Sequence, residues 1–288
     1  MRIGAISQIQ LHDSPIYSLA TRGDFLYTGS ADKTVKKLSA SSLVLQNFTV
    51  RTSHACISLF ATSSGWLCLG LLNGDFHVLD ANSNQELFSH SFGEGGIFAI
   101  SAPPDANRLY LGFSSGRIAV IDASTFEILT FEAIAKDKIR KLYFSDNGTN
   151  LYVASKDGSV SVMEASGFTL EFSWYPHQSG TNALVLTKDG RCITSGKDGF
   201  IRIWQVNSFH LMHEFPAHRG VIYDLAVVDN YLLSASRDKS IKAWDLATFR
   251  PVQKLSQHRQ SVNVIVQQNQ NSFVSASDDG TLIFWKLD

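Results

Sequence analysis

Residues 218–245 read HRGVIYDLAVVDNYLLSASRDKSIKAWD, and this stretch holds the features that decide the fold. His218 opens it, Asp238 lies in its second half, and Trp244 with Asp245 ends it. Between these residues, short apolar runs alternate with turn residues, which is the pattern of β-strands joined by tight turns. The stretch therefore predicts three short antiparallel strands.

The same features recur along the chain at a nearly constant period. The turn position occupied by Asp238 recurs at steps of 40–42 residues, at Asp32, Asn73, Ser115, Asp157, Asp198, Asp238 and Asp279. Six residues after each turn position stands a large apolar residue, in order Leu38, Leu79, Ile121, Met163, Trp204, Trp244 and Trp285. Glycine, which tolerates a positive φ, directly follows five of the turn positions, and Lys33 and Lys239 follow the other two. About four short strands per period indicate one blade of a β-propeller for each repeat.

The Trp244-Asp245 pair, with His218 upstream and Asp238 in the turn, resembles the WD-repeat (WD40) family, and the likeness covers the whole chain. It implies an all-β fold: a seven-bladed β-propeller of four-stranded antiparallel blades, forming one domain over residues 1–288. The last repeat ends at Trp285 with only three strands. We therefore expect residues 2–10 to supply its fourth strand and to close the ring, leaving no open sheet edge between blades.

The resemblance also implies hydrogen-bonded tetrads of His, Ser or Thr, Asp and Trp within single blades. A buried carboxylate needs donors and an indole N–H needs an acceptor, so such a chain is chemically consistent. The expected structural tetrads are His177, Thr194, Asp198 and Trp204; His218, Ser234, Asp238 and Trp244; and His258, Ser275, Asp279 and Trp285. A Ser-His-Asp catalytic triad is the alternative interpretation, but three copies favour a structural role repeated in each blade. Blades two to four lack the tetrad.

The composition narrows the class of protein. The net charge of -1 offers no basic surplus for general nucleic-acid binding. Cys56, Cys68 and Cys192 are odd in number, scattered and without zinc-site spacing, so we expect core thiols and no metal or cofactor. No signal peptide or 18-residue apolar run is apparent, so we expect a soluble cytoplasmic monomer with no membrane partner.

In the WD-repeat family, partners usually bind near the channel mouth, on the face that carries the b–c turns and d–a loops, where a to d are the successive strands of a blade. By repeat phase, the candidate partner-binding residues here are Tyr17, Ile57, Phe98, Arg140, Lys156, Asn182, Lys197, Tyr223, Arg237 and Asn263. Four of them are basic and four are aromatic or aliphatic, types common at binding hot spots. We expect a protein or peptide partner whose acidic residues flank a hydrophobic anchor.

The sequence thus favours a non-catalytic protein-interaction scaffold, and the alternatives remain open. One alternative is that the candidate lysines are ordinary solvated charges and that loops partly shield the aromatic residues. An enzymatic or small-ligand-binding propeller would use the central channel, but the candidate positions at the starts of the inner strands hold no Asp, Glu, His or Cys. Nucleic-acid binding through the basic residues is the third alternative, and a salt-dependent affinity would support it.

Overall fold

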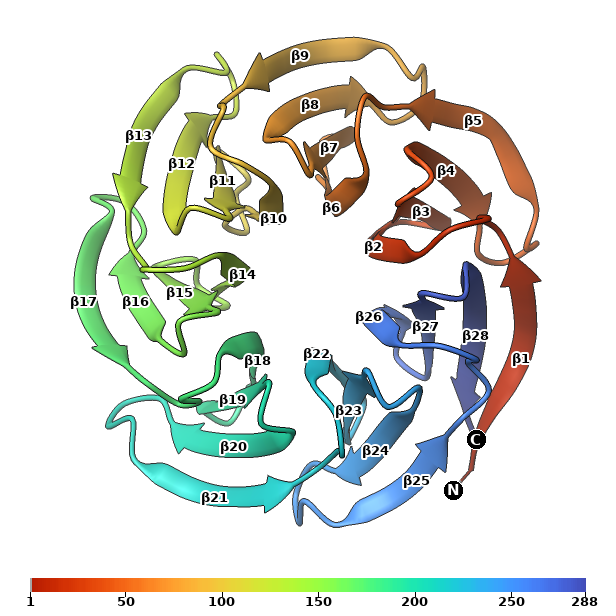
Figure 1. The fold of residues 1–288 in the computed structure, drawn as a ribbon, viewed down its shortest axis with the longest axis vertical. Helices are drawn as coiled ribbons and strands as arrows, with labels where there is room; N and C mark the ends of the chain where they lie inside the picture. The colour runs from red at the N-terminus through yellow and green to blue at the C-terminus, as the bar shows by residue number, and fades with distance from the viewer. Residues whose placement is uncertain (1) are drawn as a thin grey trace. The chain divides into compact units, whose positions relative to one another are not determined.

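Alternating apolar residues and tight turns build 28 strands in residues 2–288, the part of the chain that this computed structural model describes (Figure 1). The strands form seven four-stranded sheets, and residues 2–288 contain no helix. In six sheets the four strands follow one another in the chain, and every pairing given by register is antiparallel. The predicted fold class, an all-β propeller of seven four-stranded blades, is confirmed.

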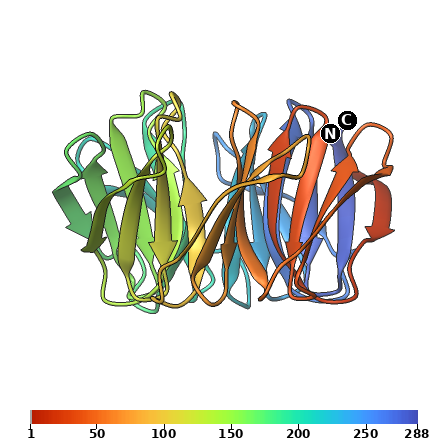
Figure 2. The ribbon, with the colours of Figure 1, turned by 90° about the horizontal axis from the view of Figure 1, so that it is seen from above.

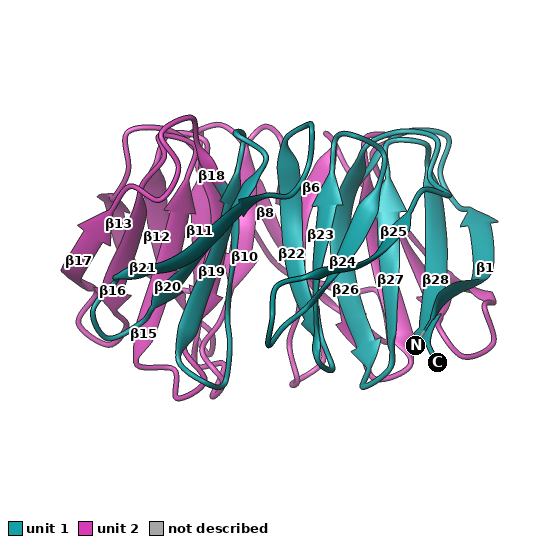
Figure 3. Ribbon diagram, turned by 90° about the horizontal axis from the view of Figure 1, so that it is seen from below, with its two compact units in different colours: residues 1–17, 182–288 teal, residues 18–181 magenta. Residues whose placement is uncertain are grey.

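The chain divides into two compact units, which Figure 3 colours separately. Unit 1 comprises residues 1–17 and 182–288, and unit 2 comprises residues 18–181. Each unit is described by itself below. The single domain over residues 1–288 stays a prediction.

Unit 2 holds blades one to four. Their strands are β2 (Ile16–Arg22), β3 (Phe25–Ser30), β4 (Thr34–Ser39) and β5 (Leu45–Arg51) in blade one; β6 (Cys56–Ala61), β7 (Trp66–Leu71), β8 (Asp75–Asp80) and β9 (Glu86–Ser91) in blade two; β10 (Ile97–Ser101), β11 (Arg108–Phe113), β12 (Arg117–Asp122) and β13 (Ile128–Ala133) in blade three; and β14 (Ile139–Phe144), β15 (Asn150–Ser155), β16 (Val160–Glu164) and β17 (Thr169–Trp174) in blade four.

Unit 1 holds blades five to seven. Their strands are β18 (Thr181–Leu186), β19 (Arg191–Gly196), β20 (Phe200–Gln205) and β21 (Leu211–Pro216) in blade five; β22 (Ile222–Val228), β23 (Tyr231–Ser236), β24 (Ile241–Asp245) and β25 (Pro251–Leu255) in blade six; and β26 (Val262–Asn269), β27 (Ser272–Ser277), β28 (Thr281–Leu287) and β1 (Ile3–Gln10) in blade seven.

The N-terminal strand completes the last blade, as predicted. β1 pairs with β28 from Ile3 opposite Leu287 to Gln10 opposite Thr281. The Gln253 side chain also grips β1, because its amide accepts from the Ile3 N–H and donates to the Ile3 carbonyl, each at 2.8 Å. The two chain ends lie side by side (Figure 2), where the Asp288 N–H donates to the Arg2 carbonyl at 3.0 Å.

The b–c turns explain the residue that follows each turn position. All seven following residues have a positive φ, between 64° and 98°, including Lys33 at 64° and Lys239 at 71°. In Gly199 the absent Cβ matters as well, since an added Cβ would collide with the His218 carbonyl. These turns therefore need glycine for φ in five blades and accept a left-handed lysine in two.

The residues six positions beyond the turns are buried in six of the seven blades, and Trp204 of blade five is half-buried. Leu38, Leu79, Ile121 and Met163 are at most 4% exposed in blades one to four, and so are Trp244 and Trp285 in blades six and seven. In blade seven, the Trp285 ring stacks on Phe273 with centroids 5.8 Å apart. Burial at these positions anchors the third strand of each blade and fixes where its b–c turn emerges.

Candidate functional site

The tetrad of blade six forms a continuous hydrogen-bonded chain. His218 Nε2 lies 2.7 Å from Ser234 Oγ, and His218 Nδ1 lies 2.9 Å from Asp238 Oδ2. The Trp244 indole N–H donates to the same Ser234 hydroxyl at 3.0 Å. The chain therefore ties the b–c turn, strands β23 and β24, and the loop that enters the blade into one buried network.

Blade seven repeats this arrangement. His258 Nε2 lies 2.7 Å from Ser275 Oγ, and the Trp285 indole donates to that hydroxyl at 2.8 Å. His258 Nδ1 lies 3.4 Å from Asp279 and 3.2 Å from the Thr281 hydroxyl. In blade five, the Trp204 indole donates to Thr194 at 3.0 Å, while His177 is fully buried and Asp198 pairs with Arg202 at 2.6 Å.

The electrostatics of the tetrads also favour a structural role. Burial raises the pKa of Asp238, but hydrogen bonds from His218 and Ser240 outweigh it and hold that pKa below its ordinary range. Burial lowers the pKa of His258, against the charge of Asp279. Ser234 and Ser275 are 0% exposed, so neither hydroxyl can reach a substrate as the nucleophile of a triad would.

The second set of candidates lies at the b–c end, meaning the end of each blade that carries its b–c turn and d–a loop. In unit 2, the side chains of Ile57 and Phe98 and the backbone of Leu72 meet there around Gly96. A Cβ built on Gly96 would lie 2.9 Å from Ile57 Cδ1, 3.0 Å from the Leu72 carbonyl and 3.0 Å from Phe98 Cε2. Leu72 is 50% exposed, so this group offers apolar surface to solvent.

Cations border this apolar group. Lys138 Nζ lies over the Phe98 ring, 4.1 Å from its centroid, and the Arg140 guanidinium carbon lies 5.5 Å from the same centroid. Lys156 is linked to the same loop, since its N–H donates to the Lys138 carbonyl at 2.9 Å. We call Ile57, Leu72, Phe98, Lys138, Arg140 and Lys156 the unit 2 surface.

The charges of the unit 2 surface are only partly compensated. Lys156 Nζ pairs with Asp137 Oδ2 at 3.0 Å, although both side chains are more than a third exposed, so the pair contributes little to stability. Burial, and then the charges of Arg140 and Lys156, lower the pKa of Lys138. Burial is the larger cause, but the part contributed by Arg140 and Lys156 shows that like charges lie close together here, and an acidic ligand would relieve their repulsion.

In unit 1, two of the candidate tyrosines lie near one another. Tyr17 is 39% exposed, and its pKa is raised by burial, by the charge of Asp278 and by Tyr223. Lys197 and Arg237 are exposed in the b–c turns of blades five and six. Neither has a carboxylate within salt-bridge distance in the described residues 2–288.

The two candidate asparagines are engaged within unit 1. Asn182 is 7% exposed, and its amide donates to the Ile222 carbonyl at 3.0 Å. The Asn263 amide donates to the Ile16 carbonyl at 2.9 Å and to Asp278 at 2.8 Å. Each amide donates to a backbone carbonyl of another inner strand, which is a structural role that the sequence pattern did not distinguish from ligand binding.

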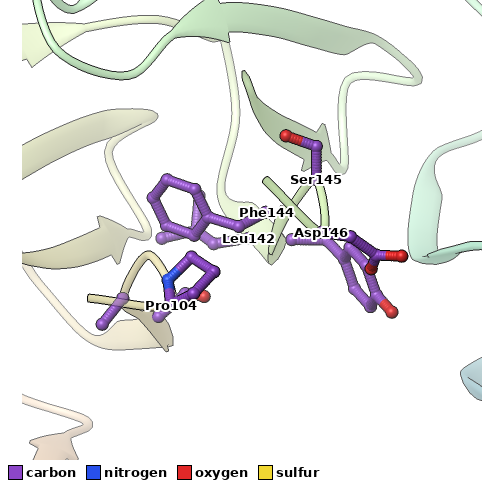
Figure 4. A pocket seen from close by; sticks show the side chains of 8 residues that line it. Pro104, Leu142, Phe144, Ser145 and Asp146 are labelled. Carbon is purple, nitrogen blue, oxygen red and sulfur yellow. The ribbon is translucent and has the colours of Figure 1, made fainter. Parts of the chain in front are cut away.

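Two further cavities involve residues that the sequence analysis did not select. In unit 2, a pocket of about 320 Å³ opens at the a–b end of blades three and four, and Figure 4 shows Pro104 and Phe144 on one side of it and the Asp146 carboxylate on the other. In unit 1, Arg219, Asp238, Lys242 and Lys254 line a cavity of about 530 Å³ in blade six. Of these four, Lys242 and Lys254 carried no signal in the repeat pattern.

The cysteines are buried inside the blades. Cys56, Cys68 and Cys192 are free thiols with 0% exposure. Burial raises the pKa of Cys56 and of Cys68 to about 12, and it raises that of Cys192 as well. These thiols stay protonated near neutral pH and pack as small apolar side chains. Among the described residues, no group of three or more His, Cys, Asp or Glu could hold a metal ion, and none forms a helix able to span a membrane.

The family model for the WD domain, G-beta repeat, matches residues 5–37, 127–162, 168–205, 209–245 and 249–286, which is more than half of the chain. The chain belongs to the WD40 family. The unmatched residues 38–126 of this WD40 chain include blade two and the first three strands of blade three, where the tetrad is missing and no tryptophan stands six positions after the turn.

Three relatives show how far the WD40 likeness extends. The kinesin-like protein KIF21A of Homo sapiens is 32% identical over 38% of this chain and 7% of its own length. Mitochondrial division protein 1 of Vanderwaltozyma polyspora is 30% identical over 30% of this chain and 14% of its own length. The WD repeat domain-containing protein 83 homolog of Dictyostelium discoideum is 24% identical over 36% of this chain and 34% of its own. This chain therefore aligns with about a third or less of each relative.

Proposed function

We propose that this WD40 chain is a non-catalytic interaction module whose unit 2 surface binds a partner segment with acidic residues beside a hydrophobic anchor. Propellers of this family are in general protein-interaction scaffolds. One observation carries the finer proposal: Ile57 and Phe98 pack around Gly96 next to the backbone of the exposed Leu72. Lys138 and Arg140 lie over the Phe98 ring, and the Lys156 N–H donates to the Lys138 carbonyl.

The two halves of the unit 2 surface would contribute differently. An apolar anchor packed on Leu72 and Phe98 would supply most of the affinity, because a few buried apolar contacts dominate such interfaces. The cations would raise the association rate and discriminate against basic partners, since long-range attraction steers encounter more than it strengthens the final complex. Charge and apolar contacts can therefore be separated by kinetics.

The test uses a partner captured by pull-down with the full chain, measured by surface plasmon resonance at two salt concentrations. Leu72→Ala should speed dissociation about fivefold or more. Lys156→Glu should slow association about tenfold at low salt and by much less at high salt. Both positions are exposed, so thermal melts of both variants should match the wild type.

Lys188→Glu is the matched control, because Lys188 is an exposed lysine in the β18–β19 turn, outside the unit 2 surface. It makes the same charge change and should leave both rate constants at their wild-type values. Wild-type kinetics in Leu72→Ala and Lys156→Glu together would refute the assignment of the partner to the unit 2 surface.

A further inference from the structure

The four residues that line the cavity in blade six are all charged. Arg219 comes from the loop before β22, Asp238 from the b–c turn, Lys242 from β24 and Lys254 from β25. Its volume of about 530 Å³ falls in the range of about 300–1,000 Å³ that is usual for small-ligand sites. Such sites are mostly apolar, so a lining of three cations and one carboxylate calls for a different kind of ligand.

Strand register places two of these cations against each other. Lys242 and Lys254 are direct partners in the β24–β25 ladder, and like charges at such positions repel. At the equivalent pair of strand positions in blade five, a carboxylate compensates the positive charge. Its cation, Arg202, stands opposite Glu214 and pairs with it at 2.8 Å and with Asp198 at 2.6 Å. Blade six therefore replaces the expected carboxylate by a second lysine.

The carboxylate of the cavity offsets one of the three positive charges but, in the part of the chain that the structure describes, forms no salt bridge with a cation of the lining. Asp238 already accepts hydrogen bonds from His218 at 2.9 Å and from the Ser240 N–H and hydroxyl at 3.1 and 2.5 Å. Lys242 Nζ donates to the Ala217 carbonyl at 2.5 Å. Across residues 2–288, Arg219 and Lys254 form no salt bridge, and both are exposed, so their donors face the cavity or solvent.

We propose that this cavity binds a phosphate monoester carried by a phosphorylated serine or threonine of a partner protein. A phosphoryl group brings a charge of about −1.5 to −2 and three acceptor oxygens. That charge balances the surplus of three cations over one carboxylate, whereas a single Asp or Glu of a partner would leave it half compensated. The Arg219 guanidinium and the Lys254 ammonium supply the donors that phosphate takes in proteins.

The position of the cavity favours an anion attached to a polypeptide. It lies at the b–c end of blade six, between a d–a loop and a b–c turn, and the exposed Arg237 directly precedes Asp238 in that turn. A free multiply phosphorylated molecule would need more cations than the three that line the cavity. This inference rests on the proposed protein-binding function but places its contact in unit 1, apart from the unit 2 surface.

Lys254→Glu is the deciding variant, because it rebuilds in blade six the cation-carboxylate pair of blade five. Two fluorescent peptide pools with the same random flanks, one with a central phosphoserine and one with serine, are titrated with the full chain by fluorescence anisotropy. The wild type should bind the phosphoserine pool at least about tenfold more tightly, and Lys254→Glu should abolish that preference.

Two controls keep the result interpretable. Lys188→Glu should retain the preference, and a thermal melt should show Lys254→Glu at least as stable as the wild type, since it removes the repulsion with Lys242. Inorganic phosphate should compete only weakly, because it lacks the peptide flanks.

Several outcomes would overturn the inference: no preference for the phosphoserine pool, a preference that survives in Lys254→Glu, or inorganic phosphate or a single-stranded oligonucleotide binding as tightly as the phosphoserine pool. None of these depends on Leu72 or Lys156. The kinetics of those two variants would still decide the proposed function by themselves.

Discussion

Replacing Asp238 by alanine measures how much one tetrad stabilises its blade. The substitution removes three hydrogen bonds, from His218 and from the N–H and hydroxyl of Ser240. It leaves the His218 ring, whose side chain is 0% exposed, with an unsatisfied ring nitrogen. A buried polar group without a partner costs about 1–3 kcal/mol, and we expect a loss of that size in the free energy of unfolding.

Ser115→Ala is the control at the matching turn position of blade three. Ser115 is exposed and makes no side-chain hydrogen bond in the described residues, so its replacement should change stability by less than about 0.5 kcal/mol. Urea unfolding at pH 7 gives both values from the shift in midpoint at constant slope. The pKa of Asp238 is lowered in the folded chain, so its stabilisation is fully present at that pH and is lost only as the pH falls through the acidic range.

The assay can contradict the tetrad directly. Equal losses for Asp238→Ala and Ser115→Ala would show that the hydrogen-bonded chain contributes nothing beyond the turn itself. Asp238→Asn separates charge from hydrogen bonding, because the amide oxygen can still accept from His218 or Ser240. A loss as large as that of alanine would assign the effect to the carboxylate charge.

Two further predictions concern stability. Deleting residues 2–10 should lower the free energy of unfolding by several kcal/mol, because it exposes β28 and removes the burial of Ile3. Gln253→Ala should lower it by only about 1 kcal/mol. An unchanged melting temperature of the truncated chain would disprove this role of β1. Burial lowers the pKa of His258 in the folded chain below its ordinary 6.5, so the unfolded chain takes up the proton first as the pH drops. The free energy of unfolding should therefore fall as the pH drops below about 6.5. The same pH dependence in His258→Gln would rule out His258 as its source.

The fold could be predicted because its determinants are local and repeated. Each period carries a turn position followed by a residue with positive φ, and a large apolar residue six positions after the turn position, as at Asp279, Gly280 and Trp285. The N-terminal strand could be predicted as well, because Ile6 and Ile9 stand at the offsets from His12 that outer-strand residues show in other repeats. These signals would mean little in a single copy, but their recurrence in every repeat made the fold predictable.

The candidate site was less predictable, because its chemistry depends on contacts between strands. Repeat phase placed Asn182 and Asn263 at the starts of inner strands, but it could not show that their amides bind neighbouring carbonyls. The repeat phase also did not select Lys254, whose importance depends on its pairing opposite Lys242 in the β24–β25 ladder. Extending the c–d register of blade five, where Arg202 stands opposite Glu214, to blade six would have exposed the unmatched lysine pair.

The two hydrogen bonds between the Gln253 side chain and the Ile3 backbone affect how the chain folds during its synthesis. The two hydrogen bonds join residues 250 positions apart, so at about 5–20 residues per second a ribosome completes β1 tens of seconds before Gln253. Through that interval the nascent chain carries an unpaired strand of eight residues. Ile3 of it is buried in the folded chain and Ile6 is 60% exposed, while Gly4, Ala5, Ser7, Gln8 and Gln10 are small or polar. The small and polar residues separate the three isoleucines, so the unpaired strand has no continuous apolar run through which neighbouring chains on a polysome would associate.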